Sequence, residues 1–110
     1  MLKALEFKLK KEGYEVIAAA DGRAALNIIQ EQDPDLIVTD IMMPFVTGLE
    51  IVDFVKAKTA KRAPVIVLSA VGLEKTVLEA FDLGADDFIT KPFSPNELLV
   101  RVKRLLLKKQ

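Results

Sequence analysis

Three side chains with complementary chemistry each sit at the end of a short apolar run. They are a carboxylate, Asp40, a hydroxyl, Ser69, and an ammonium, Lys91. The runs that precede them are Leu36–Val38, Val65–Leu68 and Phe88–Thr90. If these groups converge, the carboxylate can act as a nucleophile toward a phosphoryl group. The lysine would then offset the negative charge, and the hydroxyl would donate to the phosphoryl oxygens.

Each of these residues also has an ordinary structural interpretation. An aspartate after a strand is commonly a turn residue or a helix cap. A serine there commonly bonds to the nearby backbone, and a lysine before proline is commonly solvated. Because all three follow different buried strands, the functional interpretation is favoured, although a fold does not by itself specify a function.

The elements that must position these residues alternate along the chain. Helical spacing predicts a first helix from Leu2 that stops at Gly13 and a fourth that runs from about Leu73 to near Gly84. Three further helices are predicted by their start signals, after Asp21, at Thr47 and after Ser94. Apolar runs predict strands at Tyr14–Ala19, Leu36–Val38, Val65–Leu68 and Phe88–Thr90, with the second and third buried on both faces. Asp21, Thr47 and Ser94 are placed to cap the helices that follow them. The sequence therefore predicts an α/β fold of four parallel strands and five helices, with function at the carboxyl ends of the strands.

Composition narrows the possible functions. The chain has 110 residues and predicts a single domain, residues 1–110. It has no cysteine and no histidine, which excludes a disulfide framework, a thiolate zinc site and Ser–His–Asp chemistry. Its 16 basic and 16 acidic residues cancel, which argues against broad electrostatic binding to nucleic acid. With no apolar run of membrane-spanning length and no signal peptide, we expect a soluble, cytoplasmic protein.

Several segments together resemble the receiver domain of two-component response regulators. The resemblance covers essentially the whole chain, in order and with the family's spacing. The segments are Gly13–Val16, Asp21–Leu26, Val38–Pro44 with Gly48, Pro64–Ala70 and Gly84–Phe93. It implies a flavodoxin-like, doubly wound sheet and a phosphorelay switch without turnover, rather than an enzyme. Its expected partner is a histidine kinase or a phosphotransfer protein.

The resemblance also implies roles for single residues. Asp40 would be the phosphoacceptor, Ser69 the switch hydroxyl and Phe88 the aromatic switch that follows it inward. Lys91 would pair with the phosphorylated aspartate, and Lys91–Pro92 would be a cis peptide. The backbone carbonyl of Met42 would join Asp40 as a ligand of Mg²⁺.

The sequence departs from the family at its start. Receivers open with an apolar strand that ends in an acidic pair, and this pair holds the magnesium ion. Here residues 1–5 already read as the first helix, so we expect weak magnesium binding and slow or absent phosphorylation. A truncated chain, a misassigned start codon and an engineered fragment all fit this departure. No other acidic residue replaces the absent pair. Asp86-Asp87, Asp33 and Asp35 precede their strands and so would lie across the sheet from Asp40. Asp21 would lie on the correct edge, but it is a single carboxylate that caps a helix.

The family's sheet order, 2-1-3-4-5, would leave a gap where its first strand belongs. The Tyr14–Ala19 strand could close the gap by pairing with Leu36–Thr39, or a partner chain could fill it by swapping or edge pairing. A loosely packed, aggregation-prone fragment is the third outcome. We expect self-association, with the open strand edges as the contact.

The C-terminal part is similar to receivers of winged-helix transcription regulators. In those receivers the face formed by the last two helices and the last strand mediates dimerisation. Candidates for such a face are Asp86, Asp87, Glu97, Arg101 and Arg104, and ordinary solvated surface charge explains them equally well.

Three other functions compete with the receiver switch. The first is a receiver-like binding or assembly module that takes no phosphate, which the absent acidic pair favours. The second is a flavodoxin-like cofactor binder, which lacks the required glycine-rich loop. The third is nucleic-acid binding by the basic tail, whose cations also complement the dipole of a helix end. The tail residues are Arg101, Lys103, Arg104, Lys108 and Lys109.

Overall fold

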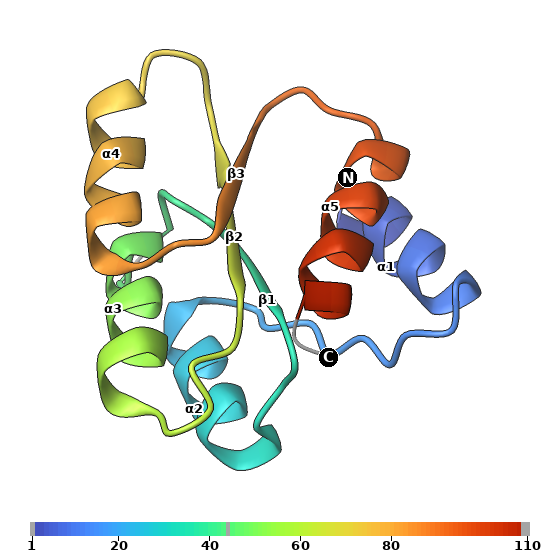
Figure 1. Ribbon diagram of the computed structural model, residues 1–110, viewed down its shortest axis with the longest axis horizontal. Helices are drawn as coiled ribbons and strands as arrows, with labels where there is room; N and C mark the ends of the chain where they lie inside the picture. Colours follow the sequence, from blue (N-terminus) through green and yellow to red (C-terminus); the bar gives the residue numbers. More distant parts are fainter. Residues whose placement is uncertain (1, 44, 109–110) are drawn as a thin grey trace.

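A computed structural model describes residues 2–43 and 45–108 of the chain (Figure 1). Within them, five helices alternate with three strands. The elements are α1 (Leu2–Lys11), α2 (Gly22–Gln32), β1 (Ile37–Asp40), α3 (Gly48–Lys58), β2 (Val65–Ser69), α4 (Glu74–Leu83), β3 (Asp87–Thr90) and α5 (Pro95–Lys108). The predicted α/β class is confirmed, and the five helices begin close to the positions that the sequence predicts.

Local capping residues determine where three of the helices begin. The side chains of Asp21, Thr47 and Ser94 each accept a hydrogen bond from the backbone N–H three residues later, at 2.9, 3.3 and 3.2 Å. These bonds satisfy amide groups that have no partner inside the helix. Helix α4 ends at Gly84, whose φ of 113° is a conformation that favours glycine. The predicted start and stop signals are therefore confirmed at these positions.

The three strands form a parallel sheet in the order β1-β2-β3. The register pairs Asp40 with Leu68 and Ser69 with Thr90. Because the strands run in one direction, their carboxyl ends meet at a single edge of the sheet. The ends of β1, β2 and β3 thus bring the predicted functional residues to the same side of the molecule.

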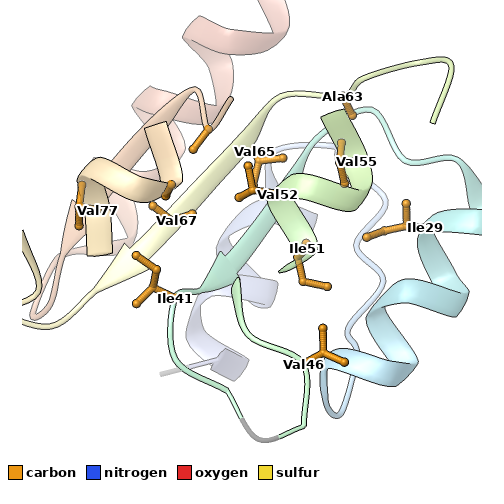
Figure 2. Close-up of a cluster of buried hydrophobic side chains, with 12 residues drawn as sticks. Ile29, Ile41, Val46, Ile51, Val52, Val55, Ala63, Val65, Val67 and Val77 are labelled. Carbon is orange, nitrogen blue, oxygen red and sulfur yellow. The ribbon is translucent and has the colours of Figure 1, made fainter. Parts of the chain in front are cut away.

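Helices cover both faces of the sheet in two separate layers. Figure 1 shows α2, α3 and α4 on one face and α1 and α5 on the other. Figure 2 shows the first core cluster, in which Val65 and Val67 of β2 meet Ile51, Val52 and Val55 of α3. The alternate β2 residues belong to the second core cluster, with α1 and α5; its buried members are Leu5, Ile66, Leu68, Ile89, Leu98, Val102 and Leu105. Every residue of the central strand β2 is buried, so β2 contributes to the core on both faces of the sheet.

The structure corrects the prediction of a fourth strand at Tyr14–Ala19. These residues belong to no strand and pair with no ladder among the described residues. The segment leads from α1 on one face of the sheet to α2 on the other. An extended segment becomes a strand only where a neighbour supplies hydrogen bonds, and the described chain supplies none here. The sheet of the described chain therefore has three strands.

A second correction concerns β1, which the sequence predicts to be buried on both faces. Only Thr39 is buried, whereas Ile37 and Val38 are half-buried. The physical reason is position: β1 has β2 on one side and no described strand on the other. An apolar run typical of a central strand thus lies at an open edge.

Candidate functional site

The structure brings Asp40 and Lys91 together at the carboxyl edge of the sheet. Asp40 is the last residue of β1, and Lys91 directly follows β3. The Lys91 ammonium Nζ forms an ion pair with Asp40 Oδ1. Their side chains are 33% and 41% exposed, so solutes can reach the pair. An accessible carboxylate beside a fixed cation is suited to reaction with an anionic electrophile.

A small cleft of about 60 Å³ opens at this pair. Its lining residues are Asp40, Ile41, Met42, Leu68, Ala70, Leu73 and Lys91. Apart from Lys91, the solvent-shielded Oδ1 atom of Asp40 has no hydrogen-bond partner in the described chain. The Thr39 hydroxyl donates to the Asp40 carbonyl at 3.0 Å and not to the carboxylate. Within the described chain, Lys91 is therefore the one partner found for this oxygen atom.

Ser69 lies at the end of β2, next to this pair but outside the cleft lining. Its side chain is buried, and its hydroxyl donates to the Ala70 carbonyl at 3.0 Å. The Ser69 carbonyl accepts the backbone N–H of Lys91 at 2.7 Å. The backbone of Ser69 therefore ties the loop after β3 to the end of β2, while its hydroxyl bonds to its own loop.

Phe88 projects from β3 on the face covered by α4. Its ring meets the ring of Phe81 edge to face, with centroids 5.8 Å apart and planes at 86°. Both side chains are partly exposed, at 36% and 39%. Nothing in the sequence singles out Phe81, because helix and strand periodicities carry no information about which faces meet. The sequence indicates Leu73, which lines the cleft, only as a helix boundary.

The described residues supply only part of a magnesium site. Asp40 contributes one carboxylate, already paired with Lys91, and Met42 lines the cleft with its side chain 64% exposed. Across residues 2–43 and 45–108, no three acidic side chains are grouped where they could hold a metal ion. Mg²⁺ requires near-octahedral oxygen ligands, so this donor set does not fit a tight site. Pro44, part of the sequence motif here, lies outside the described residues.

The other acidic residues that could have replaced the absent pair contact other groups instead of Asp40. Asp86 accepts the backbone N–H of Val65 at 2.8 Å, at the amino end of β2. Asp33 and Asp35 face Lys61, and Asp21 caps α2. The pKa of Lys61 is raised, mainly by its hydrogen bond to Asp35.

The charged residues of β3 and α5 form a network inside the chain. Asp87 pairs with Arg101 at 2.8 Å and with Arg104 at 3.0 Å, and Arg101 also reaches Glu97 at 3.3 Å. Asp86, expected with this group, instead pairs with Lys56 at 2.8 Å. Within the predicted basic tail, Lys103 pairs with Glu12, and Lys109 lies outside the described residues.

Comparisons with known proteins agree with this geometry. A family model described as the response regulator receiver domain matches residues 1–103. The receiver domain of the Francisella response regulator 1452 is similar, with 34% identity and a TM-score of 0.87 over 98% of this chain and 88% of that one. The signal receiver domain of a histidine kinase from Syntrophus aciditrophicus has 34% identity and a TM-score of 0.87, over 97% and 82% of the two chains. A response regulator receiver domain protein from Clostridium thermocellum has 27% identity and a TM-score of 0.90, over 98% and 86%.

The chain belongs to the family of response regulator receiver domains. These domains are signalling modules of two-component systems that interact with histidine kinases or phosphotransfer proteins. The expected cis peptide at Lys91–Pro92 is present. None of the described helices has the length and apolar character needed to cross a bilayer.

Proposed function

We propose that this chain is a phosphorelay receiver whose phosphoacceptor is Asp40. The observation that carries the proposal is the ion pair between Asp40 and Lys91, which joins the ends of β1 and β3 at an open cleft. The Asp40 side chain is 41% exposed and has one ion-pair partner in the described chain, which leaves the carboxylate available as a nucleophile.

The chemistry is the transfer of one phosphoryl group. An Asp40 carboxylate oxygen attacks the phosphorus atom of a phosphohistidine in the donor protein. A phosphorus–oxygen bond forms, the phosphorus–nitrogen bond breaks, and the departing imidazole takes up a proton. The product is an aspartyl phosphate. Lys91 holds its ammonium against the transferred group and offsets the added negative charge.

Two further residues would convert this modification into a conformational change. The Ser69 hydroxyl would leave the Ala70 carbonyl and donate to the phosphoryl oxygens. Phe88 would leave its contact with Phe81 and turn inward behind Ser69. Val67 and Phe88 are register partners, as are Ser69 and Thr90, so these side chains project from the same face of the sheet. That shared face supports the coupling.

Asp40 and the Met42 carbonyl would be the residues that hold Mg²⁺, and the ion would supply electrostatic stabilisation during phosphoryl transfer. The described donor set, one carboxylate with the Met42 carbonyl, does not fit a tight site. We therefore propose that this 110-residue chain binds Mg²⁺ weakly and accepts phosphate slowly.

The test is the intact mass of the chain after incubation with acetyl phosphate and Mg²⁺. Asp40→Ala is the control, and an established receiver domain is the positive control. We expect a slow gain of one phosphoryl group that is absent from Asp40→Ala. A gain that persists in Asp40→Ala would overturn the assignment of Asp40. A gain as fast as that of the positive control would overturn the proposed weakness of the magnesium site.

A second candidate function is an assembly module that acts through contacts between copies. The specific observation in its favour is the outer edge of β1, where the described chain provides no neighbouring strand. Exposed strand edges recruit other strands. This candidate does not require phosphorylation and is tested by the mass of the chain in solution.

A further inference from the structure

Strand β3 lies at one side of the sheet, with β2 as its single neighbour among the described strands. The backbone N–H of Lys91 donates to the Ser69 carbonyl at 2.7 Å, and Ser69 is the register partner of Thr90. Because a parallel strand directs every second residue toward the same neighbour, Ile89 and Lys91 bond to β2. The N–H and C=O groups of Phe88 and Thr90 therefore point to the outer edge of β3, its side away from β2.

Two charged side chains occupy this outer edge at Phe88. Asp87 Oδ1 accepts the Phe88 N–H at 2.8 Å, and Arg101 Nη1 of α5 donates to the Phe88 carbonyl at 3.0 Å. Arg101 Nη1 also donates to Asp87 Oδ1 at 2.8 Å. The carboxylate and the guanidinium thus meet both outward groups of Phe88, in the place where a neighbouring strand would bond.

Further contacts of α5 hold this pair in position. Arg101 Nη2 donates to Glu97 Oε2, one turn earlier on α5, at 3.3 Å. Arg104 Nη2 donates to Asp87 Oδ2 at 3.0 Å, so both oxygens of this carboxylate are used. The Asp87 side chain is 11% exposed, and charge-assisted hydrogen bonds that are shielded from water are stronger than bonds in free solution. The pair is therefore fixed from both the strand and the helix.

The two arginines that bind Asp87 differ in what else they contact. An ion pair that only links β3 to α5 does not need to touch the strand backbone. Arg104 is such a link, because in the described chain its hydrogen bond goes to the Asp87 carboxylate alone. Arg101 bonds in addition to the Phe88 carbonyl, through the same nitrogen atom that pairs with Asp87. Charged side chains placed along an edge are one way in which natural sheets exclude other strands.

We propose that Asp87 and Arg101 close the outer edge of β3 to strand addition. An incoming strand would have to displace the carboxylate from the Phe88 N–H and the guanidinium from the Phe88 carbonyl. It would also cover two charged groups that had lost hydrogen bonds, which is costly. The inference goes beyond phosphoryl transfer, because it states that copies of the chain do not associate through β3. Association through the outer edge of β1, the second candidate function, is a separate contact.

The test compares Arg101→Met with Arg104→Met. Both variants lose a guanidinium bound to Asp87 and keep an apolar stem on α5, but only Arg101→Met uncovers the Phe88 carbonyl. Molecular mass and amide hydrogen exchange of the parent and both variants are measured between about 10 μM and about 1 mM protein. We expect Arg101→Met to associate at least about tenfold more tightly than the parent, with rising protection of the Thr90 amide. Arg104→Met should behave as the parent does.

Each other outcome contradicts the inference. Equal association of the two variants would show that lost charge or the added methionine, and not the uncovered edge, drives the contact. Association of Arg101→Met without added protection of Thr90 would place the contact on another surface, such as the outer edge of β1. If Arg101→Met associates no more than the parent, the edge does not need these side chains to stay closed.

A measurement on the parent decides the question if Arg101→Met does not fold. Because Asp87 accepts the Phe88 N–H, the Phe88 amide should exchange at least about tenfold more slowly than an unstructured amide, at every protein concentration. Rapid exchange of this amide would overturn the inference, because the edge would then be open in the parent. Protection that rises with concentration would also overturn it, because the parent would then pair through β3.

Discussion

The contacts differ between the amino edge of the sheet, where the strands begin, and its carboxyl edge, where they end. At the amino edge, Asp86 accepts the Val65 amide and pairs with Lys56, and Lys56 also donates to the Ala63 carbonyl at 2.9 Å. At the carboxyl edge, Asp40 has one ion-pair partner, Lys91, and a cleft in front of it. Asp86 is thus held by two donors, one of them a backbone amide, and Asp40 by one.

We expect this difference to separate residues that stabilise the fold from residues that take part in chemistry. A carboxylate that accepts a buried backbone amide costs free energy when it is removed, because the amide loses its partner. A carboxylate in one accessible ion pair contributes little to stability and remains available for reaction. We therefore expect mutations at the amino edge to affect folding and mutations at the carboxyl edge to affect chemistry.

The largest effect should come from disrupting β2, the central strand, which runs from the amino edge to the carboxyl edge of the sheet. Val67 is fully buried in β2. Val67→Asp places an unpaired charge there, at a cost of several kcal/mol, roughly the stability of a small domain. We expect no cooperative thermal transition by circular dichroism. Val67→Ala should remain folded and lose about 1–3 kcal/mol. Cooperative melting of Val67→Asp near the parent temperature would contradict the central place of β2.

The next effect tests the amino edge. Asp86→Ala should lower the free energy of unfolding by about 1–3 kcal/mol, because the buried Val65 amide and the Lys56 ammonium lose their acceptor. Urea denaturation measures this loss. The matched control is Asp82→Ala, because Asp82 is an exposed residue of α4, and this variant should change stability by less than about 0.5 kcal/mol. Equal effects of the two variants would show that the Asp86 contacts are not stabilising.

A smaller effect on stability is expected at the carboxyl edge. Asp40→Ala should change the free energy of unfolding by less than about 1 kcal/mol, because it removes one accessible ion pair. The same urea titration provides the measurement, with Asp40→Asn as the variant that preserves shape. A loss comparable to that of Asp86→Ala would mean that Asp40 is structural, and the contrast between the edges would fail.

The smallest effect concerns a surface pair remote from both edges. The hydrogen bond from Lys103 holds the pKa of Glu12 below its ordinary value of 4.5. Because the folded-state pKa is depressed, the stabilisation is present above pH 4.5 and is lost as the pH falls through the folded-state pKa. Glu12→Gln should thus have a slightly lower Tm than the parent at pH 7 and the same Tm in acid. Glu15→Gln, the same substitution at another exposed position, is the matched control for the effect of the amide itself.

Much of the fold follows from local features of the sequence. The caps at Asp21, Thr47 and Ser94 and the glycine at 84 act within a few residues, so they can be recognised without knowing what surrounds them. The apolar runs before Asp40 and Ser69 likewise predict strand ends at one edge, because parallel strands share a direction. The sequence thereby predicts that Asp40 and Lys91 meet.

Other features depend on contacts between distant segments, and only the tertiary structure decides them. Tyr14–Ala19 has the composition of a strand, but the described chain provides no neighbour for it. Phe81 meets Phe88 only because α4 lies over β3. Adjacent Asp86 and Asp87 separate into different networks because successive residues at a strand start face opposite sides. Local sequence features determined the five helices and three of the four predicted strands, and packing determined which segments and surfaces found partners.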